Sequence, residues 1–154
     1  MDATQLNTIL ADFDEKIENK EYQKVVDSCK EFLKKDPKEA DLYYYMARAE
    51  HGLKDRRSAI AHFTMATKLN TQYQKAYNNR GLLYIKEGKM KEAFADLDKA
   101  ISLNNNDFTA WNNRGMAKCE TKDYEGALED YSKAISLYPK WSVAYNNRGY
   151  VYYK

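Results

Sequence analysis

The residues with the clearest chemical potential in this sequence are asparagines that occur in pairs. The pairs belong to three copies of one segment, which are Ala76-Tyr-Asn-Asn-Arg-Gly81, Ala110-Trp-Asn-Asn-Arg-Gly115 and Ala144-Tyr-Asn-Asn-Arg-Gly149. Asparagine is unfavourable inside a helix because its amide competes for backbone hydrogen bonds, so its repeated use needs an explanation. A primary amide donates and accepts hydrogen bonds, and it therefore matches the N–H and C=O groups of a peptide backbone.

The three copies are evenly spaced. Their last residues, Gly81, Gly115 and Gly149, are 34 residues apart (115 − 81 and 149 − 115). A fixed period of this length indicates stacked supersecondary units, which mostly serve as binding surfaces. Neighbouring helices in such a stack are about 10 Å apart and an extended chain rises about 3.3 Å per residue. Each asparagine pair would then meet every third residue of a bound chain, largely independently of its sequence.

The same period continues upstream in weaker form. Further positions in step with it are Tyr43, Tyr77, Trp111 and Tyr145; Ala59, Ala93 and Ala127; Ala66, Ala100 and Ala134; and Leu69, Leu103 and Leu137. This lattice resembles the tetratricopeptide repeat (TPR), a helix–turn–helix unit of about 34 residues. The resemblance implies an all-α fold, a right-handed α–α superhelix (solenoid) of about four helix pairs plus one extra C-terminal helix. We expect one domain over residues 1–154, with repeats at 6–39, 40–73, 74–107 and 108–141 and a half repeat at 142–154.

Helix pairs are also expected from the residues themselves. The chain has only six glycines and two prolines, and its apolar residues recur at intervals of three and four, as helices require. Asp55 and Asp123 are predicted to cap the second helices of their repeats. Gly81, Gly115 and Gly149 fall inside first helices, where glycine costs about 1 kcal/mol, so close packing of the second helix is expected there.

The first repeat departs from this pattern because Phe13 stands where glycine belongs. Two interpretations follow: residues 6–39 form a bulkier capping pair of helices, or they are helical by pattern only. We favour the capping pair, because terminal repeats are usually atypical and the apolar stripes persist.

Arginine and aspartate change together from repeat to repeat. Arg80 occurs with Asp96 and Arg114 with Asp130, whereas the second repeat has Met46 and His62 at these two positions. This matched change predicts an ion pair between the helices of one repeat, with a structural rather than a ligand-binding role.

The resemblance implies that the first helices line a concave groove. The peptide-binding residues it suggests are Asn78, Asn79, Asn112, Asn113, Asn146, Asn147, Tyr44, Tyr45 and Arg48. Aromatic and arginine side chains are common contact anchors, which supports the last three. The alternatives are that the asparagines bond between adjacent first helices, and that the tyrosines pack locally against the first repeat.

The half repeat at the C-terminus offers two interpretations. Residues 143–154 form a first helix whose second helix is missing, so the chain is either a segment of a longer protein or uses this helix to pack on another subunit. A homodimer through residues 143–154 is therefore the alternative to a free binding groove.

Several functional classes are not expected. No catalytic group or cofactor motif is visible, and His51 and His62 lack the spacing of a zinc site with Cys29 or Cys119. The net charge is only +2 and lysines are mixed with acids, so no nucleic-acid partner is expected. No apolar run suits a membrane, and two separated cysteines favour a reducing, cytoplasmic location.

Together these features predict a non-catalytic protein–protein interaction module, an adaptor or scaffold whose groove binds a peptide segment of a partner protein. There are two alternatives. The chain self-associates through the open C-terminal helix, or it is the interaction segment of a larger protein.

Overall fold

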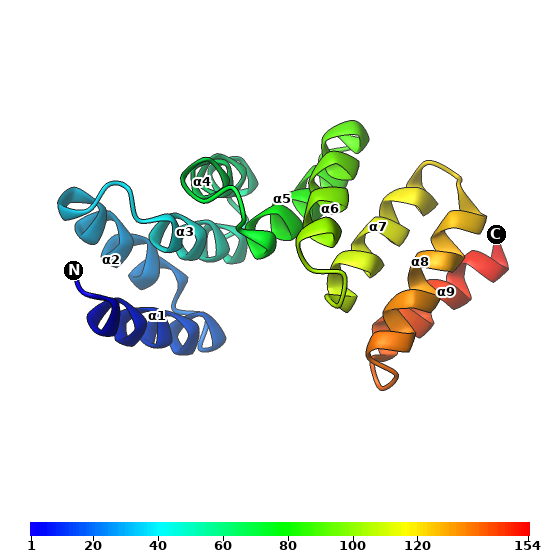
Figure 1. Ribbon diagram of the computed structural model, residues 1–154, viewed down its shortest axis with the longest axis horizontal. Helices are drawn as coiled ribbons and strands as arrows, with labels where there is room; N and C mark the ends of the chain where they lie inside the picture. Colours follow the sequence, from blue (N-terminus) through cyan, green and yellow to red (C-terminus); the bar gives the residue numbers. More distant parts are fainter. The chain divides into compact units, whose positions relative to one another are not determined.

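A computed structural model describes residues 1–154 and contains nine α-helices and no strand. The helices are α1 (Ala3–Glu18), α2 (Tyr22–Lys35), α3 (Ala40–Gly52), α4 (Arg56–Leu69), α5 (Gln74–Lys86), α6 (Met90–Leu103), α7 (Phe108–Glu120), α8 (Tyr124–Leu137) and α9 (Ser142–Tyr153) (Figure 1). The all-α prediction is confirmed. The chain forms two compact units, an N-terminal unit (Met1–Ala76) and a C-terminal unit (Tyr77–Lys154).

A short turn of constant geometry joins the two helices of each pair. One residue in each turn has a positive φ, namely Lys20, Lys54, Gly88 and Lys122, and these residues are also 34 apart. The predicted caps are confirmed, because Asp55 accepts a hydrogen bond from the N–H of Ser58 and Asp123 from the N–H of Gly126. Turn and cap together set where α4 and α8 begin, whereas α2 and α6 have no side-chain cap.

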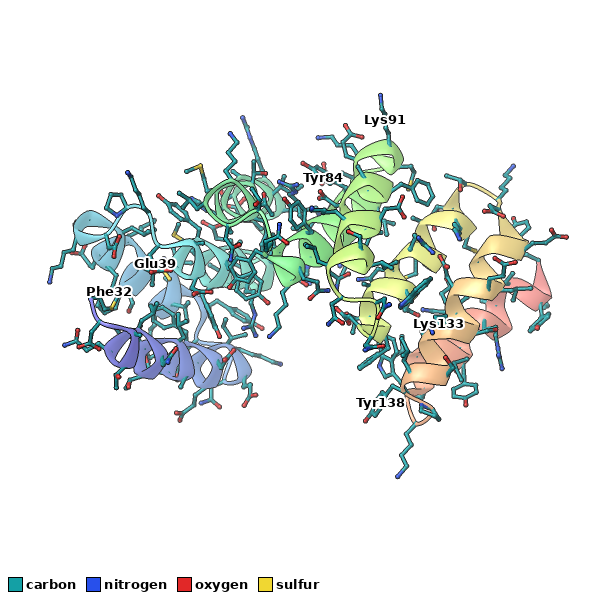
Figure 2. All side chains as sticks on the ribbon, in the orientation of Figure 1. Phe32, Glu39, Tyr84, Lys91, Lys133 and Tyr138 are labelled. Atoms are coloured by element: carbon teal, nitrogen blue, oxygen red, sulfur yellow. The ribbon has the colours of Figure 1, made fainter.

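The N-terminal unit is packed around aromatic side chains. Phe13 on α1 is only 1% exposed, and its ring centroid lies 6.5 Å from that of Phe32 on α2 (Figure 2) and 5.8 Å from that of Tyr45 on α3. Val25 and Cys29 of α2 are fully buried. The first repeat is therefore a genuine helix pair with a bulkier contact than its successors, as we favoured.

The C-terminal unit has glycine and alanine at its helix contacts. A Cβ atom added to Gly81 on α5 would lie 2.8 Å from Leu97 Cγ on α6. One added to Gly115 on α7 would lie 2.8 Å from Tyr131 Cε1 on α8. Both distances are shorter than real Cβ contacts, so the predicted close approach at these two glycines is confirmed.

The last helix, α9, packs on only one side. Val151 of α9 is 5% exposed and lies against Ala127 and Tyr131 of α8. The turn before α9 is closed by aromatic rings, since Tyr138 stacks on Phe108 with centroids 4.8 Å apart (Figure 2). None of the nine helices combines the length and the apolar character needed to cross a membrane.

Candidate functional site

The asparagines of the C-terminal unit bond from one first helix to the next. Asn113 Nδ2 on α7 donates to Asn78 Oδ1 on α5 over 3.0 Å. Asn147 Nδ2 on α9 donates to Asn112 Oδ1 on α7, also over 3.0 Å. We call Asn78, Asn112, Asn113 and Asn147 the asparagine network. Its bonds are those that the sequence offered as the alternative to ligand binding.

A threonine at the start of α7 fixes the direction of these bonds. Thr109 Oγ1 donates its hydrogen to Asp107 Oδ1 over 2.6 Å, because a carboxylate can only accept. The same Oγ1 must therefore accept from Asn78 Nδ2, which lies 2.8 Å away. This leaves Asn78 Oδ1 to accept from Asn113 Nδ2. Thr109 and Asp107 could not be identified from the sequence, because neither residue recurs with the 34-residue period.

Two carbonyl oxygens of the network are accessible to solvent. No fully buried side-chain nitrogen or oxygen lacks a hydrogen-bond partner. The Oδ1 atoms of Asn113 and Asn147 accept no bond within the protein, so neither atom can be fully buried. Both side chains are held by their Nδ2 bonds, and the two oxygens therefore form a fixed pair of hydrogen-bond acceptors on α7 and α9.

The remaining predicted asparagines differ in exposure. Asn78, Asn112 and Asn113 are 5%, 2% and 8% exposed. Both the oxygen and the nitrogen of Asn78 and Asn112 have partners within the protein, so their contribution to a groove is indirect, through orienting Asn113 and Asn147. Asn112 Nδ2 also lies 3.6 Å from Met116 Sδ. Asn79 on α5 is half-buried and Asn146 on α9 is exposed.

Tyr44, Tyr45 and Arg48 lie together on α3 in the N-terminal unit. Tyr45 Oη donates to Asp14 Oδ2 over 2.7 Å, and Arg48 Nη1 lies 2.6 Å from Asp14 Oδ1. The Arg48 guanidinium also covers the Tyr45 ring at 5.0 Å. Partial burial works to raise the pKa of Asp14, but the bonds from Arg48 and Tyr45 outweigh it and hold this pKa below its ordinary value.

A hollow adjoins this aromatic cluster. It has a volume of about 370 Å³ and is lined by Leu10, Asp41, Tyr44, Tyr45, Tyr73, Gln74 and Lys75. The Tyr44 and Tyr73 rings are 4.9 Å apart, and Tyr73 Oη donates to Asp41. Asp14 on α1, the partner of Tyr45 and Arg48, could not be identified from the sequence, because the first repeat departs from the common pattern.

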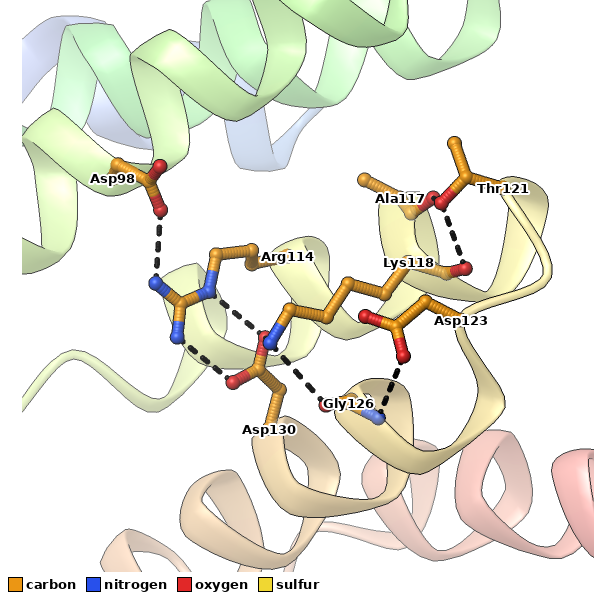
Figure 3. Close-up of polar contacts among 8 residues, drawn as sticks. All are labelled: Asp98, Arg114, Ala117, Lys118, Thr121, Asp123, Gly126 and Asp130. Carbon is orange, nitrogen blue, oxygen red and sulfur yellow. Dashed lines mark hydrogen bonds and ion pairs between the residues drawn. The ribbon is translucent and has the colours of Figure 1, made fainter.

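The predicted ion pairs are confirmed. Arg80 Nε and Nη2 each lie 2.7 Å from the carboxylate of Asp96, and Arg114 pairs with Asp130 in the same two-pronged manner at 2.8 and 2.9 Å. Figure 3 shows that Arg114 also reaches Asp98 on α6, over 2.8 Å. These arginines bridge helices, and the carboxylates of Asp96 and Asp130 are nearly buried, which fits a structural role, whereas Asp98 is exposed.

The second repeat also pairs a nitrogen side chain with a carboxylate, but here the carboxylate is on the first helix of the repeat instead of the second. His62 Nδ1 on α4 lies 2.7 Å from Glu50 Oε2 on α3, and Glu50 is 6% exposed. Met46 occupies the place of arginine, as the matched change suggested, and is itself buried. Glu50 was not identified from the sequence, because no other repeat has an acid there.

No group of three or more His, Cys, Asp or Glu side chains is arranged to hold a metal ion. Cys29 and Cys119 are unpaired thiols, and burial raises the pKa of Cys29 to about 12. A buried thiol with so high a pKa is a poor nucleophile.

The helix pairs, the glycine contacts and the 34-residue period can now be compared with known proteins. Residues 75–107 and 108–140 each match the model of the tetratricopeptide repeat family. The chain therefore contains two tetratricopeptide repeats, at residues 75–107 and 108–140. Its matched segments overlap the third and fourth predicted repeats, whereas the bounds 6–39 and 40–73 stay predictions.

Solved TPR structures share this fold. MamA is 25% identical, with a TM-score of 0.80 over 94% of this chain and 80% of that one. YrrB, a TPR protein with an unusual peptide-binding site, is 21% identical, with a TM-score of 0.78 over 89% of this chain and 71% of that one. The first TPR of Spaghetti (RPAP3), solved with an HSP90 peptide, is 22% identical, with a TM-score of 0.70 over 73% of this chain and 89% of that one. The sequence matches no curated protein.

Proposed function

We propose that this TPR protein is a non-catalytic interaction module that binds a peptide segment of a partner protein along its first helices. The observation that carries the proposal is the pair of fixed, solvent-accessible oxygens, Asn113 Oδ1 and Asn147 Oδ1. Backbone N–H groups of an extended segment are the donors that suit such a row of acceptors.

The network supports this use because it is rigid before a ligand arrives. Asn113 and Asn147 each donate one N–H to the preceding first helix, so these side chains need not be ordered again on binding, and the entropic cost of binding falls. A single neutral hydrogen bond contributes only about 1 kcal/mol, so recognition would need several asparagine side chains to bond to the segment. Asn79 and Asn146 extend the proposed row in the C-terminal unit. Tyr44, Tyr45 and Arg48 are proposed separately, as aromatic and cationic contacts within the N-terminal unit.

The comparisons support the proposal at the level of fold. YrrB is described as having a peptide-binding site and RPAP3 was solved with a peptide, and both have helix pairs like those of this chain. Neither is similar enough in sequence to say which peptide this chain binds.

The test begins with peptides selected from a displayed random library against the wild-type chain. Replacing Asn113 and Asn147 together with alanine should weaken the selected peptides about tenfold, because two hydrogen bonds are lost. The triple variant that also carries Asn79→Ala should weaken them further. Asn106→Ala is the matched control, since it removes an exposed asparagine from the loop before α7. Unchanged affinity in a folded triple variant would refute the groove.

Self-association through residues 143–154 is the second candidate function. It is favoured by the exposed aromatic side chains of α9, among which Tyr152 is 73% and Tyr153 89% exposed. A dimer that the change Tyr152→Glu abolishes would establish it.

A further inference from the structure

The two accessible oxygens of the asparagine network lie one repeat apart. Asn113 on α7 and Asn147 on α9 are separated by one period of 34 residues (147 − 113). The two helices are direct neighbours, because Asn147 Nδ2 bonds to Asn112 Oδ1 over 3.0 Å. Helices in such contact have axes about 10 Å apart, so about the same distance separates Asn113 Oδ1 from Asn147 Oδ1.

The two oxygens also have equivalent orientations. Asn113 donates its Nδ2 to Asn78, and Asn147 donates its Nδ2 to Asn112, in both cases on the preceding first helix and over 3.0 Å. Because the same bond holds each amide, each oxygen points in the equivalent direction from its helix. A chain that binds both oxygens must therefore present two unbonded N–H groups on one face, about 10 Å apart.

Neither regular secondary structure presents its N–H groups in this way. A β-strand rises about 3.3 Å per residue and alternates its two faces, so N–H groups on one face are about 6.6 or about 13 Å apart. The strand residue three places along is at the right distance, but it faces the opposite side. In an α-helix the N–H groups beyond the first turn are bonded within the helix.

The polyproline II helix meets both requirements. It has three residues per turn and rises about 3.1 Å per residue, so residues i and i+3 face the same side about 9.3 Å apart. Its backbone makes no internal hydrogen bonds, and every N–H that it carries is available to a binding partner. The repeat of this conformation therefore agrees with the repeat of the first helices.

We propose that the asparagine network binds its partner segment in the polyproline II conformation, with the N–H of residue i on one of the two oxygens and the N–H of residue i+3 on the other. The inference rests on the proposed function and narrows it to an unstructured partner segment, as opposed to a β-strand or a preformed helix. Unfolded chains already populate this conformation, so ordering such a segment costs little. Asn79, one period before Asn113, extends the same spacing.

The experiment is an ester scan of the strongest peptide selected from the library. Each backbone amide in turn is replaced by an ester, which removes one N–H and keeps the shape of the chain, and affinity for the wild-type protein is measured by calorimetry. We expect weakening of about threefold at positions three residues apart and about tenfold when two such positions are changed together. The scan needs no variant of the protein to fold.

Protein variants then assign the sensitive positions. In Asn147→Ala, one of the sensitive esters should have no further effect, while an ester three residues away should still weaken binding about threefold. Asn106→Ala, in the loop before α7, is the control and should leave the whole pattern unchanged.

The spacing of the sensitive positions separates this inference from the proposed function. Sensitive positions two or four residues apart would overturn the polyproline II conformation in favour of a strand, and would leave the asparagine row as the binding site. A single sensitive position would overturn it as well, since only one oxygen would then be used. A peptide that binds with no sensitive position would refute the row and the inference together.

Discussion

At the scale of single residues, the molecule uses the same side-chain type for different purposes in different repeats. Asn112, at the fifth position of a repeat, and Asn113, at the sixth, are both buried, but the Asn112 oxygen accepts a bond within the protein whereas the Asn113 oxygen does not. Likewise, Arg114 binds two carboxylates, whereas Arg148 binds none. Neighbouring helices, not residue type, decide what each side chain does.

The buried carboxylate of Asp130 should matter more than an exposed one. Asp130→Ala leaves Arg114 with only Asp98 and deprives Lys118, whose Nζ is 3.1 Å away, of a partner (Figure 3). We expect a loss of about 3 kcal/mol in the free energy of unfolding, measured by urea denaturation. Asp123→Asn is the control, because asparagine caps a helix as well as aspartate does. Equal melting temperatures for the two variants would contradict the structural role of the pair.

At the scale of helices, glycine has opposite consequences at equivalent positions. Gly115→Ala pushes a methyl group against the Tyr131 ring, which is 2% exposed and cannot move away, so we expect a loss of about 1 to 2 kcal/mol. Gly149→Ala meets nothing and should stabilise α9 by about 1 kcal/mol, through helix propensity alone. Thermal unfolding of both variants checks the opposite signs. A lower melting temperature for both would mean that α9 is covered in solution.

The helices can be predicted from the sequence because the same pattern of residues recurs in each repeat. Apolar spacing, the caps Asp55 and Asp123, and the paired change of arginine and aspartate all follow from comparing one repeat with the next. A contact that occurs in only one repeat cannot be found by comparing the repeats. Asp14 and Glu50 belong to single repeats, and the direction of the asparagine bonds depends on Thr109, so these needed three-dimensional coordinates.

At the scale of the whole molecule, the charge of α9 bears on association. The chain should sediment as a monomer of 18.0 kDa over about a hundredfold range of concentration, since a symmetric pair through α9 would bring like charges together. Sedimentation equilibrium at low and high salt is the measurement. A mass that rises with concentration, and rises more readily in high salt, would indicate that screening allows the copies to pair.

The two accessible oxygens of the asparagine network have a consequence for which segments can lie against them. Both atoms are amide oxygens, which only accept hydrogen bonds, and the Nδ2 bond of each side chain to the neighbouring helix fixes where its oxygen lies. Proline is the one residue whose backbone brings no hydrogen to such a contact. Such a row of acceptors would bind segments with many different side chains, but it would exclude proline at the positions that face an asparagine oxygen. The position of proline in a partner segment would therefore determine the register in which the segment binds.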